Sequence, residues 1–239
     1  VTEQQINDTH LTKLEYNKYG QVTEETHNNI SLTHTYNNGE LISLNPIISS
    51  IERDKFRQIT QITFSNGTQF IYNYNGQQKT SFSVLDDNDK NLWTQNYKYN
   101  NHLINKVITK SSNGTHEINT QDKLMHQEHP KIPESYKITD PDYSWEGQLL
   151  SNLADSTEIQ YDHNGEIFSA TKNKSKLIKH GQNLFELDDQ FIKRIQIEGI
   201  TIAVSVNDQI YPAIEDFRGS LVALIKDSNL LFERTYDLW

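Results

Sequence analysis

Four consecutive residues, Asp86-Asp87-Asn88-Asp89, form the densest acidic cluster of the sequence and are the first candidate for a metal site. A calcium-binding loop requires oxygen ligands at alternating positions, a glycine for its sharp turn and a glutamate further on. Neither the glycine nor the distal glutamate follows in place. The cluster therefore favours a solvated hairpin turn over a metal site.

Two histidines three residues apart, His126 and His129, are the second candidate for metal binding. Their spacing could place both rings on one face of a helix, but a metal site needs at least a third fixed ligand. No such ligand stands nearby, in a segment that also contains Pro130 and Pro133. We therefore expect exposed loop histidines, and the sequence predicts no metal and no cofactor.

Pairs of acidic residues could supply the two carboxylates of a glycoside hydrolase. They stand at Glu24-Glu25, Asp188-Asp189 and Glu215-Asp216. Neighbouring side chains in a strand point to opposite faces, so these doublets do not direct two carboxylates at one substrate. The sequence therefore favours a protein without enzymatic activity, and a hydrolase is the less favoured alternative.

Three aromatic residues, Trp93, Tyr97 and Tyr99, are close enough in sequence to form an exposed platform on which sugar rings could stack. The favoured interpretation is that these rings pack across the strands of a thin sheet instead. An exposed platform would make the chain a β-rich adhesin or a carbohydrate-binding module, which is the alternative function.

The composition limits which elements can position these residues. Of the 239 residues, 34% are hydrophobic, below the roughly 45–50% of an ordinary globular domain. The 12 Tyr, 9 Phe and 3 Trp argue against disorder, because disordered chains are poor in aromatic residues. Asn, Thr, Ser and Tyr are weak helix formers, so a helical bundle is not expected.

Charge and cysteine content exclude further classes of protein. The formal net charge of −10 argues against nucleic acid as a partner, since nucleic-acid binding needs a basic face. The absence of cysteine excludes disulfides, zinc–thiolate sites and thiol catalysis. No stretch approaches 18 apolar residues in a row, so we expect no membrane insertion by this segment.

Apolar and polar residues alternate through most of the chain, which is the period of a half-buried strand. Such runs stand at 32–36, 59–64, 70–74, 81–84, 159–161 and 200–206. Short turn signals separate them at Asn37-Asn38-Gly39, Ser65-Asn66-Gly67, Asn75-Gly76, Asn113-Gly114 and Asn164-Gly165. Asn-Gly favours the type I′ hairpin turn, because both residues tolerate a positive φ. The sequence therefore predicts an all-β fold of consecutive antiparallel hairpins.

The glycines suggest that these hairpins form a repeat. Gly147, Gly165, Gly181, Gly199 and Gly219 follow one another at steps of 16 to 20 residues, the length of one short hairpin with its turns. A single hairpin cannot bury its own faces and must stack on its neighbours. We expect one array over residues 1–239, with a Pro-rich loop or insertion at about 122–143.

Several turns share more than a glycine. Their formula is Tyr, then Asn or Asp, a short polar spacer, Gly, a polar residue and usually an aliphatic one. The copies carry Tyr16 with Gly20, Tyr36 with Gly39, Tyr74 with Gly76, and Tyr161-Asp162 with Gly165; residues 97–103 look like a copy without its glycine. This formula resembles the YD repeat of the RHS family. Asn or Asp can close an Asx turn, Gly supplies a positive φ, and the Tyr can stack on the Tyr of the next hairpin.

The C-terminal residues, about 208–239, resemble the final RHS unit. That unit has an Asp-x-x-Gly-Ser turn, here at Asp216 and Gly219, followed by a strand, a short turn and a closing Arg-x-Tyr-Asp. The closing residues are Arg234, Tyr236 and Asp237.

The resemblance implies a curved, spiralling single-layer sheet that forms part of a hollow shell. In bacterial RHS proteins, including C components of insecticidal toxin complexes and polymorphic toxins, the shell encloses a C-terminal toxin. The chain is too short to close such a shell, so the resemblance implies a section of its wall. Its expected partners are the remaining parts of the shell and the enclosed toxin, and its expected location is that of a secreted bacterial toxin or effector.

Overall fold

The computed structural model describes residues 2–6, 10–27, 30–120, 142–143, 149–152, 157–161, 167–172, 174–179, 184–188, 190–217 and 219–233. Within these ranges the chain forms strands and turns, and no helix long and apolar enough to cross a membrane is found there. The predicted all-β fold of consecutive antiparallel hairpins is confirmed. Residues 121–141, most of the expected Pro-rich insertion, lie outside the described residues.

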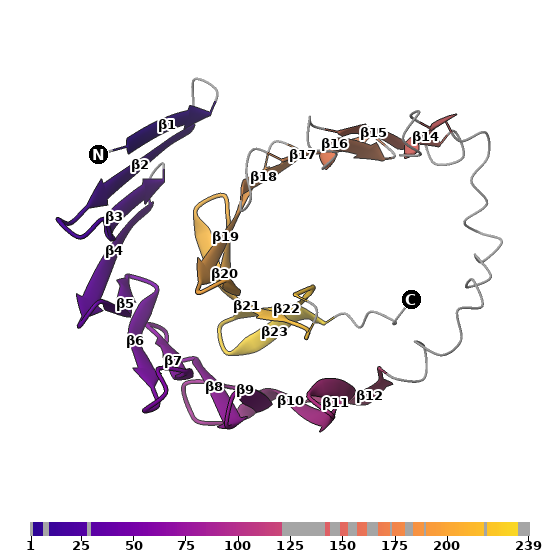
Figure 1. Cartoon of the computed structure of the whole chain (residues 1–239). Helices are drawn as coiled ribbons and strands as arrows, with labels where there is room; N and C mark the ends of the chain where they lie inside the picture. The colour runs from indigo at the N-terminus through magenta and orange to yellow at the C-terminus, as the bar shows by residue number, and fades with distance from the viewer. Residues whose placement is uncertain are drawn as a thin grey trace. The chain divides into compact units, whose positions relative to one another are not determined.

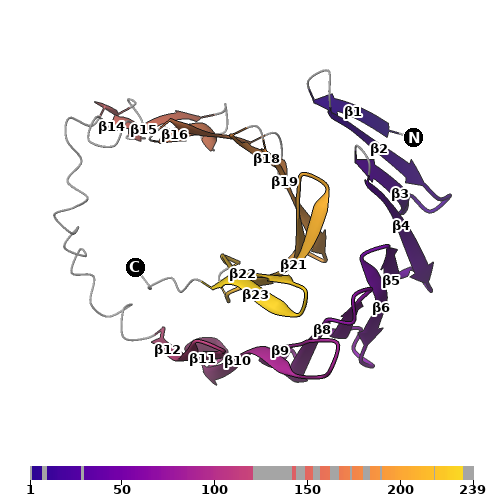
Figure 2. The same cartoon turned by 180° about the vertical axis from the view of Figure 1, so that it is seen from behind.

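The first sheet has twelve strands, in chain order from β1 to β12. They are β1 (Thr2–Ile6), β2 (His10–Tyr16), β3 (Val22–His27), β4 (Ile30–Asn37), β5 (Glu40–Asn45), β6 (Ile48–Arg53), β7 (Ile59–Phe64), β8 (Gln69–Asn75), β9 (Gln78–Leu85), β10 (Asn91–Asn100), β11 (Leu103–Ser111) and β12 (Gly114–Asn119). Figure 1, and Figure 2 from behind, show these strands following one another along a bent sheet.

The second sheet has eleven strands, again in chain order. They are β13 (Asp142–Tyr143), β14 (Leu149–Asn152), β15 (Thr157–Tyr161), β16 (Ile167–Lys172), β17 (Ser175–Lys179), β18 (Leu184–Leu187), β19 (Gln190–Ile197), β20 (Ile200–Val206), β21 (Gln209–Glu215), β22 (Leu221–Lys226) and β23 (Asn229–Glu233). By their contacts, Val1–Gln127 and Val222–Trp239 form one compact unit and Glu128–Leu221 forms another.

The core of the first unit lies along one face of its sheet. Facing residues on successive strands are buried together: Phe70 lies opposite Ile62 on β7 and opposite Val84 on β9, and Val84 lies opposite Trp93 on β10. Phe70 also makes an edge-to-face contact with Phe82, with 5.4 Å between the ring centroids. The period of two observed in the sequence therefore becomes one apolar face, stabilised by cross-strand pairs of aromatic and aliphatic side chains.

In the second unit, β20 is buried in a different pattern from the strands of the first sheet. Thr201, Ile202, Ala203, Val204 and Ser205 are all buried. Side chains alternate between the faces of a strand, so five buried residues in a row mean that both faces are covered. The expectation of a half-buried strand at 200–206 is therefore wrong, since short apolar runs of this kind are also typical of strands covered on both faces.

Two-residue loops with a positive φ at both positions join several hairpins, as a type I′ turn requires. They are Asn38-Gly39, Asn101-His102, Glu198-Gly199, Asn207-Asp208 and Asp227-Ser228. The type I′ prediction is confirmed at Asn38-Gly39 and wrong at Asn66-Gly67, Asn75-Gly76 and Asn113-Gly114, where the Asn has no positive φ. At Asn75-Gly76 the loop is Gly76-Gln77, in which Gly76 alone has a positive φ, because Asn75 still pairs with Gln78 in the ladder.

Replacing Phe70 with alanine tests the one-faced core. Phe70 is 1% exposed, so Phe70→Ala should lower the free energy of unfolding by about 3–5 kcal/mol. The matched control is Phe56→Ala, because Phe56 is 65% exposed and its contact with the Lys55 ammonium contributes about 1 kcal/mol or less. Urea titrations followed by tryptophan fluorescence compare the two variants, and equal losses would contradict the assigned core.

Candidate functional site

The tyrosines of the repeated formula gather on one edge of the first sheet. This edge, called here the tyrosine-turn edge, consists of the turns that join β2 to β3, β4 to β5, β6 to β7, β8 to β9 and β10 to β11. Four of these turns are preceded by a tyrosine: Tyr16, Tyr36, Tyr74 and Tyr99. The antiparallel order brings turns that are about twenty residues apart in sequence to the same edge.

A β-bulge accompanies each of these tyrosines. The ladder shifts register between Glu15 and Tyr16, Thr35 and Tyr36, Asn73 and Tyr74, and Lys98 and Tyr99, and also before Tyr161 in the second unit. In every case the strand after the turn contains one additional residue. A bulge bends its strand and increases the local twist. The sequence formula did not reveal it, because its signal is one extra residue and not a residue type.

Two of the tyrosine hydroxyls connect one hairpin to the hairpin before it. The Tyr36 hydroxyl donates to the carbonyl of Val22 at 2.9 Å, and the Tyr99 hydroxyl donates to the carbonyl of Lys79 at 2.8 Å. Val22 lies opposite Tyr16, and Lys79 lies opposite Tyr74. Burial raises the pKa of both donating tyrosines. The contact between copies is therefore made here by a hydroxyl group, whereas the sequence predicted ring stacking.

Four five-residue turns closed by Asn or Asp occur among the described residues. They start at Asn17, Asp54, Asp86 and Asp216, and the side-chain oxygen of each accepts a backbone N–H four residues on. The fourth residue has a positive φ and is a glycine in the turns of Asn17 and Asp216. The Asx turn that the YD formula predicts thus forms at Asn17. The turns of Asp54 and Asp86 were missed, because their fourth residues are Arg57 and Asp89.

The acidic cluster at 86–89 owes its position to this turn. Asp86 is 6% exposed, and its Oδ1 accepts the N–H groups of Asn88 at 2.9 Å and of Lys90 at 2.8 Å. Asp87 and Asp89 are exposed. In the part of the chain that the structure describes, no three His, Asp or Glu side chains come close enough to hold a metal ion.

Polar side chains connect each turn of the tyrosine-turn edge to the next. Gln21 donates to the carbonyl of Gly39, Glu40 accepts from Arg57, and Gln78 contacts the His102 ring. The Gln58 amide nitrogen, oriented toward its acceptors, donates to the carbonyl of Gly76. Glu40 and Gln78 are the first residues of the returning strands β5 and β9, and Gln21 and Gln58 stand immediately before β3 and β7. For Gln21 and Glu40 the signal in the sequence was the polar residue after the glycine, to which no role was assigned; Gln58 and Gln78 do not follow a glycine directly.

Close contacts also connect turns on the opposite edge of the same unit. Gly67 has a φ of +87°, and a Cβ added there would lie 2.7 Å from the Cβ of Asp87 in the next turn on that edge. Asp87 also accepts a hydrogen bond from the Ser228 hydroxyl at 2.9 Å. Nearby, the Glu233 carboxylate accepts from the Ser111 hydroxyl at 2.6 Å and from the Asn113 amide at 2.6 Å. The hairpin β22–β23 is thus attached to the first sheet by polar groups.

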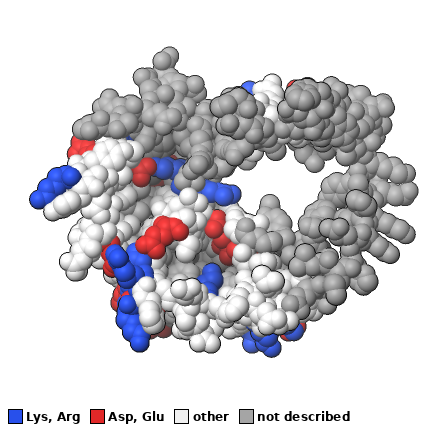
Figure 3. Space-filling view, in the orientation of Figure 1, with Lys and Arg blue, Asp and Glu red and all other residues white. Residues whose placement is uncertain are grey.

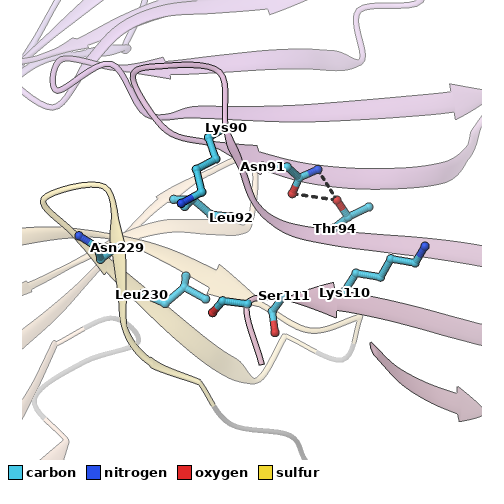
Figure 4. A pocket seen from close by; sticks show the side chains of 9 residues that line it. Lys90, Asn91, Leu92, Thr94, Lys110, Ser111, Asn229 and Leu230 are labelled. Carbon is cyan, nitrogen blue, oxygen red and sulfur yellow. Dashed lines mark hydrogen bonds between the residues drawn. The ribbon is translucent and has the colours of Figure 1, made fainter. Parts of the chain in front are cut away.

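A shallow pocket of about 360 Å³ lies beside this hairpin. It is lined by Lys90, Asn91, Leu92, Thr94, Lys110, Ser111, Ser112, Asn229 and Leu230. Figure 4 shows the ammonium groups of Lys90 and Lys110 pointing in different directions, and Asn91 hydrogen-bonded to Thr94. The polar groups do not converge on one point, so the pocket has no arrangement suited to catalysis.

The predicted aromatic platform is not exposed. Trp93 is 1% exposed and Tyr97 is 6% exposed, with the Tyr97 hydroxyl donating to the Gln95 amide oxygen at 2.8 Å. Tyr99 is half-buried and is used in the contact with Lys79. The less favoured alternative of an exposed platform is therefore wrong for Trp93 and Tyr97, because both belong to the buried face of β10.

Other predicted residues lie elsewhere or outside the described part of the chain. Glu24 accepts a hydrogen bond from the Ser31 hydroxyl, Asp188 accepts from the N–H of Lys176, and Asp216 closes a turn. The predicted residues outside the described ranges are His126, His129, Asp162, Gly165, Asp189, Arg234, Tyr236 and Asp237. On the face shown in Figure 3, acidic and basic side chains of the described residues are interspersed.

Comparison with known proteins identifies the fold. No protein-family model matches the chain, and no curated protein matches it. The chain is similar to one in the crystal structure of TcdB2-TccC3 without its hypervariable C-terminal region, with a TM-score of 0.58, 10% identity, and coverage of 97% of this chain and 18% of that chain. For TcdB2-TccC3-Cdc42 the TM-score is 0.56 at 9% identity with the same coverage.

For TcdB2-TccC3 the TM-score is 0.51 at 10% identity, again over 97% of this chain and 18% of that chain. This chain thus spans less than a fifth of the length of the chains that it matches. At this identity the similarity is one of fold, and it supports the RHS-like fold that the sequence predicted.

Removing the Asp86 side chain tests the Asx turn. Asp86→Ala leaves two backbone N–H groups without their acceptor, so the free energy of unfolding should fall by about 2 kcal/mol. Asp86→Asn retains the accepting oxygen, as at Asn17, and should retain most of the stability. Urea titrations of the three proteins measure the free energy of unfolding. An equal loss in both variants would mean that the negative charge of Asp86 stabilises the fold, and not the oxygen that closes the turn.

The hydroxyl contacts predict a pH dependence of stability. Because burial raises the pKa of Tyr36 and Tyr99, the folded protein keeps both protons at pH values where the unfolded chain has lost them. This stabilisation is complete below a pH of about 10 and is lost as the pH rises further. Tyr36→Phe/Tyr99→Phe should therefore show a weaker loss of stability than the parent between pH values of about 9 and 11. Urea titrations at each pH measure the free energy of unfolding, and an equal decrease with pH in the variant and the parent would contradict this account.

Proposed function

We propose that this chain is a segment of the wall of an RHS-type toxin shell, as a non-enzymatic structural part. The observation that carries the proposal is the fold similarity to TcdB2-TccC3 chains over 97% of this chain. Coverage of 18% of those chains fits a segment and not a complete shell. The YD-like turns are the independent support, since they stand at the turns of the sheet and connect one hairpin to the next.

The segment acts by confinement in this proposal. Opposite its buried face, the first sheet presents hydroxyl and amide side chains such as Thr63, Ser83, Thr94 and Asn96. Some of these pair with one another across strands, as Asn73 does with Ser81 at 2.9 Å. A polar face of this kind offers an enclosed polypeptide no large apolar patch to bind. The wall would separate its cargo from the surroundings without holding it tightly.

The proposed partners are the other segments of the same shell and the polypeptide enclosed in it. The proposed location is outside the producing bacterium, as part of a secreted toxin or effector. A carbohydrate-binding function is not favoured, because Trp93 and Tyr97 are buried.

The experiment uses the natural-length polypeptide that carries this sequence. Trypsin digestion of the native protein, followed by mass spectrometry, should leave one segment outside the β-sheets intact. The same segment should be cut once urea opens the sheets, because it is shielded and not intrinsically resistant. Asp86→Asn serves as the control for Asp86→Ala, which should lower the urea concentration at which protection is lost. Complete digestion of all non-sheet segments in the native protein would overturn the proposal.

A further inference from the structure

The junction between β5 and β6 differs from every other junction in the first sheet. Its ladder consists of one residue pair, Leu44 with Ile48, whereas the other junctions of β1 to β12 have three or more. All residues between Glu40 and Arg53 are described. Beyond the turn at Pro46-Ile47, the two strands therefore run side by side in the sheet order without a backbone ladder.

Charged side chains bridge the end of this junction where the ladder is absent. Arg53, at the end of β6, has its Nε 3.9 Å from Oε2 of Glu40, at the start of β5. Arg57, in the next turn, contacts Oε1 of the same carboxylate through its Nε. Arg53 Nη1 also donates to the carbonyl of Arg57 at 3.1 Å. One carboxylate thus faces two guanidinium groups on the tyrosine-turn edge.

Arg53 and Glu40 differ from the residue types found at the equivalent positions of the other turns on the tyrosine-turn edge. Arg53 follows a register shift and precedes an Asx turn, the position that a tyrosine occupies in the other four turns. Glu40 stands where Gln21, Gln58 and Gln78 stand in the other turns. Arg53 and Glu40 thus both stand where the other turns have neutral residues. They flank the one junction of this sheet that has a single ladder pair.

We propose that the β5–β6 junction is a seam in the sheet, locked by the ionic contact of Glu40 with Arg53 and Arg57. Elsewhere in the first sheet, several pairs of backbone hydrogen bonds hold each strand to the next, and a side-chain contact is an addition. At the seam the side chains take over that role. The Arg53 side chain is 8% exposed and that of Glu40 is 27% exposed, so their attraction is screened less by water and salt than that of a surface pair.

The seam is a place where the sheet can open without breaking a long ladder. Loss of the ionic contact would expose the facing edges of β5 and β6, whose backbone groups could then accept another strand. This proposal concerns the sheet alone and holds whether or not the chain forms part of a shell.

Hydrogen exchange of the full chain, resolved by peptide and mass spectrometry, tests the seam. Glu40→Gln introduces the residue found at the equivalent positions and should leave the fold intact. We expect faster exchange in peptides covering 40–53 and unchanged exchange in peptides covering β8 and β9. High salt should accelerate the same peptides in the parent and have little further effect in Glu40→Gln. The control Gln78→Ala removes a neutral contact at another junction and should not change exchange at 40–53.

A covalent lock gives a second readout. The chain has no cysteine, so Asn38→Cys and Lys55→Cys, both at exposed positions, can be joined by a flexible bismaleimide across the two turns. The crosslink should restore slow exchange at 40–53 in Glu40→Gln, because it replaces the ionic contact. The proposal is overturned if Glu40→Gln and Gln78→Ala give the same exchange at 40–53, or if the crosslink fails to slow exchange in Glu40→Gln.

Discussion

Among the described residues, each strand pairs only with the strands next to it in chain order within its own sheet, and the rest of the structure depends on that constraint. A hairpin that is stacked in this way has turns at both ends of its strands and no backbone partner from a distant part of the sequence. The turns must therefore place each new strand in register with the previous one. Residues with a positive φ, Asx side-chain oxygens and β-bulges set this register, and they are therefore concentrated at the turns.

The same constraint explains why polar side chains are so important in a chain with few hydrophobic residues. The buried face of the first sheet provides cohesion along its middle, through Phe70, Val84 and Trp93. At the edges, where water has access, hydroxyl, amide and ionic contacts connect one turn to the next. A Tyr hydroxyl that donates to a carbonyl of the preceding hairpin joins two units without lengthening either strand. The first sheet thus combines a one-sided apolar core with polar connections at its turns.

Much of the fold could be predicted from the sequence, because alternation and turn residues act locally. Asn38-Gly39 forms the expected turn because the ladder ends at the pair Asn37 with Glu40 and leaves these two residues as the loop, whereas Asn75 remains in the ladder and shifts the loop by one residue. The turns of Asp54 and Asp86 were not predicted, because Arg57 and Asp89 stand where the formula has a glycine, and the backbone adopts a positive φ at both. For Trp93 the sequence favoured packing across strands, but it could not predict that the face of Trp93 is the covered one, because alternation identifies two faces without saying which of them is covered.

The strand order also determines how the protein can be built. A sheet whose neighbours in space are neighbours in sequence has local contacts, and local contacts form early and fast. Each hairpin can add to the sheet as it leaves the ribosome, without waiting for a later segment. The hydrogen bonds of Glu233 with Ser111 and Asn113 are different. They join residues more than a hundred positions apart and can form only after the whole intervening chain has been synthesised.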